Sequence, residues 1–343
     1  MQKPITIKDL AKELNLSPST VSRALNDRWD VNQQTRQRVL DAAEKMNYRP
    51  NVMSLGLKRN QTFTVGVVIP EFVNSFFAEV INGIESVLHD RNYQLLICQS
   101  SESPAIEKRN IEFMESRHVD GFLVSVSHQS QMADYYTSLI ERGYPVVFFN
   151  RYCQGVRAPR VIVDDRKWAF AATEHLIRQG CRRIVHLEGP DNLSVSDLRR
   201  EGYIDALVSY NIPVDESLII PSGIFLEDGQ AAAEKILAMS RRPDGIFAVN
   251  DMSAIGAMKE LKSRGVSIPK DMAVVGFSES RMATIVEPNL TSVSQPTFEI
   301  GASSARLILE WMQIGRMPRN LEIKLDASLN VRESSLRKVV RKR

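Results

Sequence analysis

The sequence has few cysteines and no long apolar run, and these absences exclude several protein classes. Its three cysteines, Cys98, Cys153 and Cys181, form no CxxC pair and have no Cys/His spacing typical of a metal site. An odd number of cysteines without such spacing fits a reducing compartment. No stretch approaches the 18 apolar residues of a membrane span, and the N-terminus lacks the apolar core of a signal peptide. We therefore expect a cytoplasmic protein that does not enter a membrane.

Sequence signatures of catalysis are also missing. The chain has no GxGxxG, GxxxxGK[ST], HExxH or GxSxG motif, and its five histidines are scattered. No cysteine has an obvious nearby histidine that would activate it as a nucleophile. We therefore expect no catalytic residues, no bound metal, no cofactor and no enzyme activity.

Charge is distributed unevenly along the 343 residues. The net charge is +3, yet residues 1–60 contain eleven Lys or Arg against six Asp or Glu, and residues 336–343 contain five cations and no acid. The region between them is net acidic. A basic head on an acidic body indicates that the head meets a polyanion. We interpret 336–343 as a disordered basic tail, with a secondary DNA contact as the alternative.

The first 50 residues have the pattern of three short helices. Thr6, with Asp9 three positions later, has the spacing of a capping box at the start of the first helix. Ser17 is placed to cap the second helix, and Pro18 stands at its first position, where a missing N–H costs nothing. The third helix is expected to begin near Asn32. A short capped helix, a tight turn and a second helix with a polar outer face are typical of a helix-turn-helix; a three-helix domain that binds protein is the alternative.

The outer face of the second helix carries hydrogen-bonding side chains. Arg23 can read guanine through two hydrogen bonds, while Ser19, Thr20 and Ser22 can contact phosphates or base edges. Residues 51–61 then link the head to the body. Their apolar residues beside Lys58-Arg59 have the composition of a minor-groove wedge, with a plain linker as the alternative.

From residue 62 onward, short apolar strands alternate with longer helical stretches. The alternation restarts after Val161. Continuous apolar strands separated by helices indicate parallel sheets covered on both faces. Two rounds predict an α/β fold with two lobes and a ligand at the carboxyl ends of the strands. Strands are expected over residues 64–70, 94–98, 121–125, 145–150, 183–187, 217–220, 245–249 and 272–277.

Polar side chains gather where these strands end, and Phe76-Phe77 begin the first helix of the body. Aromatic rings with convergent Asn, Asp, Arg and Ser suit a polyhydroxylated ligand, because hydroxyls need directional partners and a sugar ring needs a flat apolar surface. Taken singly, Asp164-Asp165 is better explained as a helix cap. The polar strand-end residues are Ser125, Ser127, Asn150, Arg151, Asp164, Asp165, Asn250, Asp251, Ser278 and Glu279.

Four segments resemble the LacI/GalR family of bacterial transcription regulators: TIKDLAKELNLSPSTVSRALN, VNQQTRQRVLDAAEKMNYRPN, VNDMSAIGAMKELKSRG and PNLTSVSQP. The resemblance covers essentially the whole chain. It implies a homodimeric repressor of carbohydrate-use genes that binds pseudo-palindromic double-stranded operator DNA. It also implies a body like the periplasmic sugar-binding proteins, with three crossovers between its lobes and a small sugar, sugar acid or phosphosugar as effector.

The resemblance further implies domain bounds. These are a helix-turn-helix head (1–50), a hinge helix or linker (51–61), an effector-binding and dimerisation domain (62–335) and the basic tail (336–343). Within the third, lobe 1 takes about 62–161 and 292–325, and lobe 2 takes about 162–291 and 326–335.

Site residues follow by position in the same resemblance. Pro18, Ser19 and Arg23 fall where the family reads bases, and Leu57 falls where paired hinge helices insert a leucine into the minor groove. The candidate DNA-binding residues are Thr6, Ser17, Pro18, Ser19, Thr20, Ser22, Arg23, Asn26, Asn51 and Leu57. The candidate effector-binding residues are Phe76, Phe77, Ser125, Asn150, Arg151, Asp164, Arg199, Phe225, Asn250, Asp251, Ser278 and Gln295.

The chain departs from the family pattern at several positions. Pro18 has no polar side chain, so readout there rests on Ser19 and on DNA shape. Ser278 replaces an acid that clasps sugar hydroxyls in many relatives, with Glu279 as the candidate substitute. Trp168 replaces a small residue and either narrows the cleft mouth or packs there.

Two other protein classes share parts of this pattern. A sugar-binding protein of a transport system is the alternative function; it shares the two-lobed body but needs a signal peptide and has no DNA-binding head. A sugar-processing enzyme needs a catalytic carboxylate pair or a cofactor loop, and the sequence offers neither.

Overall fold

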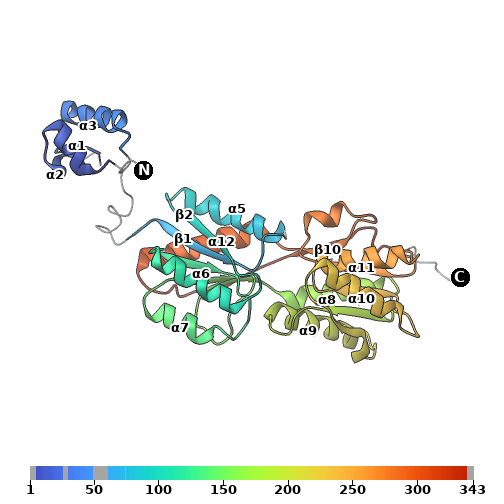
Figure 1. Ribbon diagram of the computed structural model, residues 1–343. Coiled ribbons are helices and arrows are strands. Elements are labelled where there is room, and N and C mark those ends of the chain that lie inside the picture. The colour runs from blue at the N-terminus through green and yellow to red at the C-terminus, as the bar shows by residue number, and fades with distance from the viewer. Residues whose placement is uncertain (1–4, 26–29, 49–60, 74, 338–343) are drawn as a thin grey trace. The chain divides into compact units, whose positions relative to one another are not determined.

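The computed structural model describes residues 5–25, 30–48, 61–73 and 75–337. These residues belong to two compact units, Met1–Thr62 and Phe63–Arg343 (Figure 1). Three candidate DNA-binding residues, Asn26, Asn51 and Leu57, lie outside the described residues. Nearly all of the 51–61 link and most of the basic tail also lie outside them.

The first unit is a three-helix head. Helices α1 (Ile7–Leu14), α2 (Pro18–Leu25) and α3 (Gln33–Lys45) pack around a small core that includes Leu10 and Val21. The predicted capping box is present: the Thr6 hydroxyl accepts the Asp9 N–H at 3.3 Å, and the Asp9 carboxylate accepts the Thr6 N–H at 2.8 Å. Side-chain caps satisfy N–H groups that a helix start leaves without partners, which makes these starts readable from sequence.

The second unit contains two six-stranded sheets. The lobe 1 sheet is wholly parallel, with strand order β11-β5-β4-β3-β1-β2. The lobe 2 sheet has order β12-β10-β9-β8-β6-β7, and β12 is antiparallel to β10. The lobe 1 strands are β1 (Thr64–Ile69), β2 (Gln94–Gln99), β3 (Gly121–Val124), β4 (Val146–Phe149), β5 (Arg160–Val163) and β11 (Glu322–Leu325). The lobe 2 strands are β6 (Ile184–Glu188), β7 (Ile219–Pro221), β8 (Gly245–Ala248), β9 (Ala273–Phe277), β10 (Thr291–Ser294) and β12 (Ser328–Asn330).

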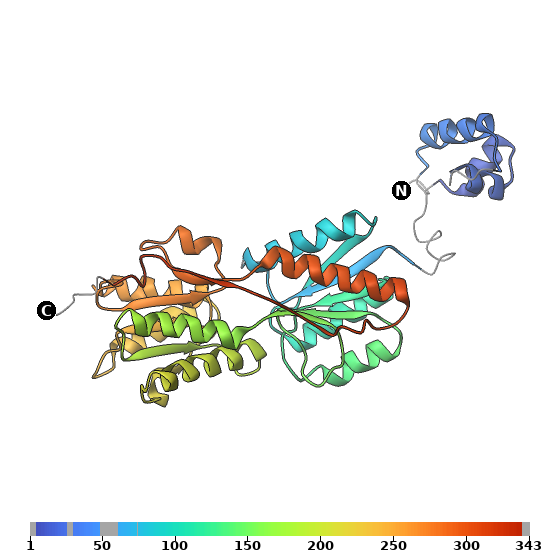
Figure 2. The ribbon, with the colours of Figure 1, turned by 180° about the vertical axis from the view of Figure 1, so that it is seen from behind.

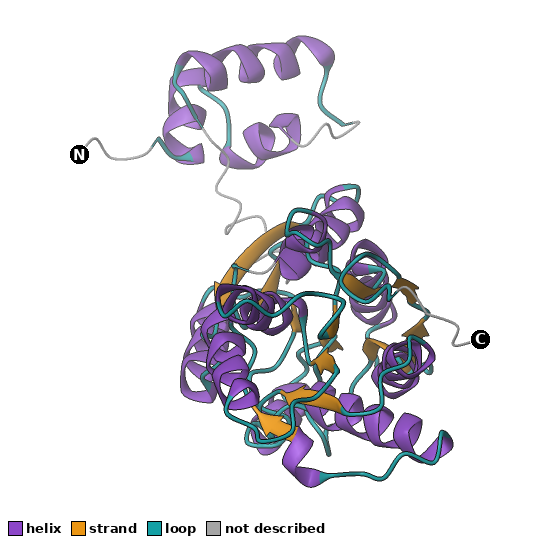
Figure 3. Ribbon diagram, turned by 90° about the vertical axis from the view of Figure 1, so that its right-hand side faces the viewer, coloured by secondary structure: helices purple, strands orange, loops and turns teal. Residues whose placement is uncertain are grey.

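Helices cover both faces of each sheet, as continuous apolar strands require (Figure 3). In lobe 1, α5 and α12 pack on one face and α6 and α7 on the other. In lobe 2, α10 and α11 cover one face and α8 and α9 the other. Their bounds are α5 (Ser75–His89), α6 (Pro104–Ser116), α7 (Ala133–Glu141), α8 (Asp165–Arg178), α9 (Ser194–Ser209), α10 (Leu226–Leu237), α11 (Asp251–Ser263) and α12 (Thr297–Ile314), with 3-10 turns η1 (Glu216–Leu218) and η2 (Arg281–Thr284).

Three chain connections join the lobes: β5 to α8, β10 to α12, and β11 to β12 (Figure 2). The predicted lobe bounds need two corrections. β5 stays in the lobe 1 sheet to Val163, beyond the predicted limit of 161, and β10 stays in the lobe 2 sheet to Ser294, beyond the predicted limit of 291. Ser217-Leu218, predicted as strand, lie in η1. Apolar periodicity shows that a strand exists, but hydrogen bonding between distant segments decides which sheet it joins.

No helix among the described residues is both long and apolar enough to cross a membrane.

Candidate functional site

The outward face of α2 is the candidate DNA interface. Pro18, Ser19 and Arg23 are exposed, whereas Val21 and Ala24 are buried on the opposite side. The Arg23 Nη1 lies 3.1 Å from the Asp30 carboxylate, and 61% of the Arg23 side chain remains exposed. An exposed ion pair of this kind is weak. The Arg23 guanidinium can therefore leave Asp30 at little cost in free energy.

Two candidate residues of the head have hydroxyls that cap helices. The Ser17 hydroxyl accepts the Thr20 N–H at 3.1 Å and lies 2.7 Å from the Ser19 hydroxyl. The Thr6 hydroxyl belongs to the capping box. The structure brings Ser17, Ser19 and Thr20 together at the start of α2, where backbone N–H groups favour a phosphate.

The candidate ligand cleft lies between the two lobes. Its volume is about 650 Å³ including the open mouth. Eight predicted effector-binding residues line it: Phe76, Phe77, Asn150, Arg151, Arg199, Phe225, Asn250 and Ser278. Six further lining residues were missed: Glu71, Val73, Val195, Ile224, Val249 and Met252.

The lobe 1 side of the cleft comes from the start of α5 and the end of β4. The Phe76 and Phe77 rings meet edge to face with centroids 5.1 Å apart. Asn150 directly follows β4 with a left-handed backbone (φ 57°), which Asn tolerates better than most residues. Next to it, Arg151 Nη1 donates to both carboxylate oxygens of Glu102, at 3.0 and 2.8 Å.

The lobe 2 side contains Arg199, on the second turn of α9. Its Nη2 lies 2.6 Å from the Asp165 carboxylate, its Nη1 donates to the Val249 carbonyl at 2.5 Å, and its guanidinium carbon lies 3.7 Å from the centre of the Phe277 ring. Burial raises the pKa of Asp165, although the Arg199 charge opposes this. Burial also lowers the pKa of Arg199.

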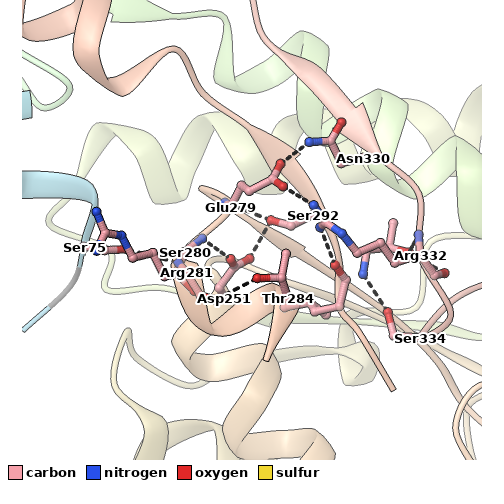
Figure 4. Close-up of polar contacts among 12 residues, drawn as sticks. Ser75, Asp251, Glu279, Ser280, Arg281, Thr284, Ser292, Asn330, Arg332 and Ser334 are labelled. Carbon is pink, nitrogen blue, oxygen red and sulfur yellow. Dashed lines mark hydrogen bonds and ion pairs between the residues drawn. The ribbon is translucent and has the colours of Figure 1, made fainter. Parts of the chain in front are cut away.

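Asp251, the first residue of α11, stands in the sequence between two residues that line the cleft, Asn250 and Met252. Figure 4 shows the polar contacts of its carboxylate. Its carboxylate accepts the Ser280 N–H at 2.5 Å and the Ser292 hydroxyl at 2.6 Å. Burial raises the pKa of Asp251 to about 7. Beside it, Arg281 N–H donates to the Ser75 hydroxyl at 3.2 Å and so links lobe 2 to α5 of lobe 1.

Four predicted effector-binding residues do not line the cleft. Asp164 caps α8 and accepts the Lys167 N–H at 3.1 Å, because a carboxylate at a helix start is recruited by the backbone N–H groups of that helix. Asp251 is held by the contacts just described. Gln295 is buried, and its Nε2 donates to the Ser278 hydroxyl at 3.4 Å. Ser125 is fully buried.

The structure also shows the contacts of Glu279 and Trp168, the residues named in two of the departures from the family pattern. Glu279 does not substitute for the missing acid, because its carboxylate faces Asn330 and Arg332 (Figure 4). Trp168 does not line the cleft; it packs against the cores of both lobes, and its Nε1 donates to Asp326 at 3.2 Å.

The missed lining residues are mostly apolar, and an apolar residue in a strand or helix carries no sequence signal that separates cleft wall from core. Glu71 is different. It is a polar residue two positions after the end of β1, so the strand-end rule applied to the other candidates would have found it.

The chain is similar to known regulators along most of its length. The family model "Bacterial regulatory proteins, lacI family" matches residues 6–51, and the model "Periplasmic binding protein-like domain" matches residues 173–335. Catabolite control protein A of Priestia megaterium is 31% identical over 328 residues, which are 93% of this chain and 98% of that protein. The HTH-type transcriptional repressor CytR of Escherichia coli (strain K12) is 32% identical over 310 residues, which are 90% of each chain. A solved complex of the transcriptional regulator CelR with cellobiose has a TM-score of 0.74 at 30% identity and covers 96% of this chain and 99% of that one.

Proposed function

Because this chain belongs to the LacI family of bacterial regulatory proteins, we propose that it represses carbohydrate-use genes by binding operator DNA as a dimer, under the control of a small ligand held between lobes 1 and 2. It acts in the cytoplasm, where its DNA target is, and catalyses no reaction. The similar proteins named above are transcription regulators, which supports this view.

The exposed face of α2 is the observation that carries the proposal. Pro18, Ser19 and Arg23 lie at the surface of a compact, capped three-helix unit. In a helix-turn-helix, the second helix enters the major groove with such a face toward the base edges. Arg23 supplies the guanine-reading group, and the other cations of the head supply salt-dependent phosphate contacts.

The cleft supplies the control. A ligand that binds the closed arrangement of the lobes more tightly shifts the population toward it, and operator affinity changes if the two arrangements differ in how they present the heads. Within the 51–61 link, Leu57 is the proposed minor-groove wedge. Leu57→Ala should weaken operator binding and leave ligand affinity intact.

The test uses an operator selected from a random duplex pool by the full-length chain. Gel shifts then compare the wild type, Arg23→Ala and the control Arg109→Ala, which removes a cation from the exposed surface of α6. Arg23→Ala should weaken the selected operator by roughly 10- to 100-fold, and the control should bind like the wild type. Equal affinity for selected and scrambled duplexes would contradict the proposal.

A further inference from the structure

Cationic side chains gather at the end of lobe 2 where strands β6, β8 and β9 begin. Two arginines directly precede β6, two more shortly precede β8, and a lysine shortly precedes β9. The Arg183 Nε donates to the Arg241 carbonyl at 3.2 Å, so the segments before β6 and β8 are in contact. With an arginine near the C-terminus, these residues form what we call the distal basic surface: Arg182, Arg183, Arg241, Arg242, Lys270 and Arg337.

Contacts made by Asp244 and Arg337 join the segments of the distal basic surface. The Asp244 carboxylate accepts the Arg183 N–H at 2.9 Å, and the Asp244 backbone carbonyl accepts the Arg337 guanidinium. The Arg337 Nε also donates at 3.0 Å to the carbonyl of Pro269, the residue before Lys270. The six cations therefore belong to one continuous surface, although they come from four separate parts of the chain.

Positive charge is in excess on this surface. The acids on its segments or in contact with them are Asp215, Asp244 and Asp271, and of these Asp215 pairs with Arg183 at 2.9 Å. Four members are exposed and form no ion pair with any carboxylate that the structure describes: Arg182, Arg241, Arg242 and Lys270. The region from residue 61 to residue 335 is net acidic as a whole, so the excess at this surface is local.

Residues 338–343 add cations next to the same surface. They follow Arg337 directly in sequence and contain four Lys or Arg and no acid. A chain of six residues spans at most about 20 Å when fully extended. Because Arg337 is anchored by its backbone contacts, the four charges stay within that distance of the distal basic surface in any conformation.

The distal basic surface lies away from the ligand cleft. The cleft is lined by residues that follow the carboxyl ends of β1, β4, β8 and β9, whereas this surface lies at amino ends of strands. The amino end of β1, where the chain enters the second unit, also points away from the cleft, but on the lobe 1 side. The entry point of the chain and the distal basic surface are therefore at opposite ends of the unit (Figure 2).

The chemistry of the surface fits the phosphates of a nucleic acid duplex. Its cations are spread over separate loops, an arrangement that suits an extended polyanion, and guanidinium and ammonium groups contact phosphates whatever the base sequence. Binding of single strands uses aromatic side chains on which bases stack. Residues 176–183, 238–244, 264–272 and 334–343 contain no Phe, Tyr, Trp or His.

We infer that the distal basic surface, with the cations of residues 338–343, binds duplex DNA without regard to sequence, at a site separate from the head. The choice of DNA as the polyanion rests on the proposed function, because a chain held on an operator meets neighbouring duplex at high local concentration. One protein then contacts two duplex segments, the operator through its heads and a second segment through lobe 2.

The test gives the head its operator first and then offers a second duplex. Full-length protein is mixed with a stoichiometric amount of a short selected operator, and a fluorescent duplex of scrambled sequence is titrated into the complex. Fluorescence anisotropy measures the affinity at several salt concentrations. The complex should bind the scrambled duplex, and the logarithm of the affinity should fall linearly with the logarithm of salt concentration, by about 0.9 for each phosphate contacted.

Substitutions on the surface give the decisive comparison. The variant Arg241→Gln/Arg242→Gln/Lys270→Gln should make the salt slope shallower by about 2 to 3 and weaken binding of the second duplex by about tenfold or more at low salt. Arg241→Lys/Arg242→Lys keeps the charges and should bind within about threefold of the wild type.

A control variant removes the same amount of charge from exposed helix positions elsewhere on the body. Lys108→Gln/Arg109→Gln/Lys259→Gln changes α6 and α11 and should keep the wild-type slope. A lower slope in the surface variant alone then reports contacts at the distal basic surface, because both variants have the same net charge.

Three results would overturn the inference. They are no binding of the scrambled duplex by the operator complex at low salt, equal slopes in the surface variant and the control variant, and tighter binding of single-stranded DNA or phosphatidylserine vesicles than of the duplex. The repressor proposal fails at a different step, when no operator can be selected from the random pool, so the two failures are distinguishable.

Discussion

Asp165 and Arg199 form a buried ion pair between the first residue of α8 and the second turn of α9, with 2.6 Å between carboxylate and guanidinium and 5% of each side chain exposed. A buried ion pair contributes little net stability, because the cost of desolvating the two charges offsets their attraction. Removal of one partner leaves the other charge buried without a counter-charge. This relationship changes how a substitution at Arg199 must be interpreted. Lost ligand response in Arg199→Ala alone does not identify a ligand contact.

Arg199→Ala is therefore expected to destabilise lobe 2. Because it leaves the Asp165 carboxylate buried without its cation, it should lower the free energy of unfolding by about 3 to 5 kcal/mol. The double variant Asp165→Leu/Arg199→Met should recover much of that loss. Arg166→Ala, which breaks an exposed pair with Asp205, is the matched control and should be nearly neutral. Urea unfolding measures the free energy of unfolding of each variant. If the effects of substituting Asp165 alone and Arg199 alone add up to the effect of the double variant, the two residues are not coupled.

Asp251 should make the protein less stable as pH rises toward neutrality. Burial raises its folded pKa to about 7 from the ordinary value of 3.8, so between these two pH values the folded state holds a proton that the unfolded state has lost. This contribution is complete below pH 3.8 and is lost as pH rises through about 7, and it amounts to about 4 kcal/mol at most. Asp251→Asn should flatten this part of the pH dependence. Urea unfolding from pH 4.5 to 8 measures it.

The exposed Asp134→Asn on α7 is the control for that experiment and should keep the wild-type pH dependence. An identical slope in Asp251→Asn and in the wild type would show that the Asp251 carboxyl stays ionised in the folded state.

The packing of α5 against α12 requires glycine at Gly301. A Cβ placed there would lie 1.9 Å from the Val80 carbonyl oxygen, and backbone cannot yield as a flexible side chain does. Gly301→Ala should therefore destabilise lobe 1 by about 2 kcal/mol or more. Gly315→Ala is the comparison: its Cβ would meet nothing within 4 Å, so only its positive φ of 72° costs energy, about 1 kcal/mol. Equal losses in the two variants would exclude the helix contact as the cause.

Asp30 should compete with DNA for Arg23. Since the ion pair at 3.1 Å occupies one guanidinium nitrogen, Asp30→Ala should release Arg23 and raise operator affinity by up to about tenfold, mostly at low salt. Arg23→Ala and the double variant should bind equally weakly. Fluorescence anisotropy with the selected operator checks this, and an increase in affinity from Asp30→Ala in the Arg23→Ala background would point to general repulsion between Asp30 and phosphate.

Local features were the most predictable from sequence. The caps at Thr6 and Ser17 and the start of α3 after Asn32 depend on side chains that bond to N–H groups three residues away. The strand-end rule also predicted Asn150-Arg151, which line the cleft together with Phe76-Phe77 from the start of the first helix of the body. Such features succeed because the partner lies within a few residues, or because parallel strands share one edge.

Polar residues with distant partners were not predictable. Asp251 and Glu279 follow the same strand-end pattern as Asn250 and Ser278, yet Ser280, Ser292, Asn330 and Arg332 hold them away from the cleft lining. These partners lie 29 to 53 residues away in sequence. No local pattern indicates which of two neighbouring polar residues such a distant partner will hold.

Short-range periodicity and capping are sufficient to predict the three-helix head, the alternation of strands and helices, and the edge of each sheet where polar groups collect. Tertiary structure alone decided the lobe to which β10 belongs and the matching of each cleft arginine by a carboxylate. It also decided which apolar side chains of lobe 2, among them Ile224 and Met252, line the cleft. These properties arise from contacts between segments far apart in the chain, because such contacts both remove a polar group from water and supply its hydrogen-bonding or ionic partner. The polarity and charge of the ligand cleft therefore depend on the tertiary fold.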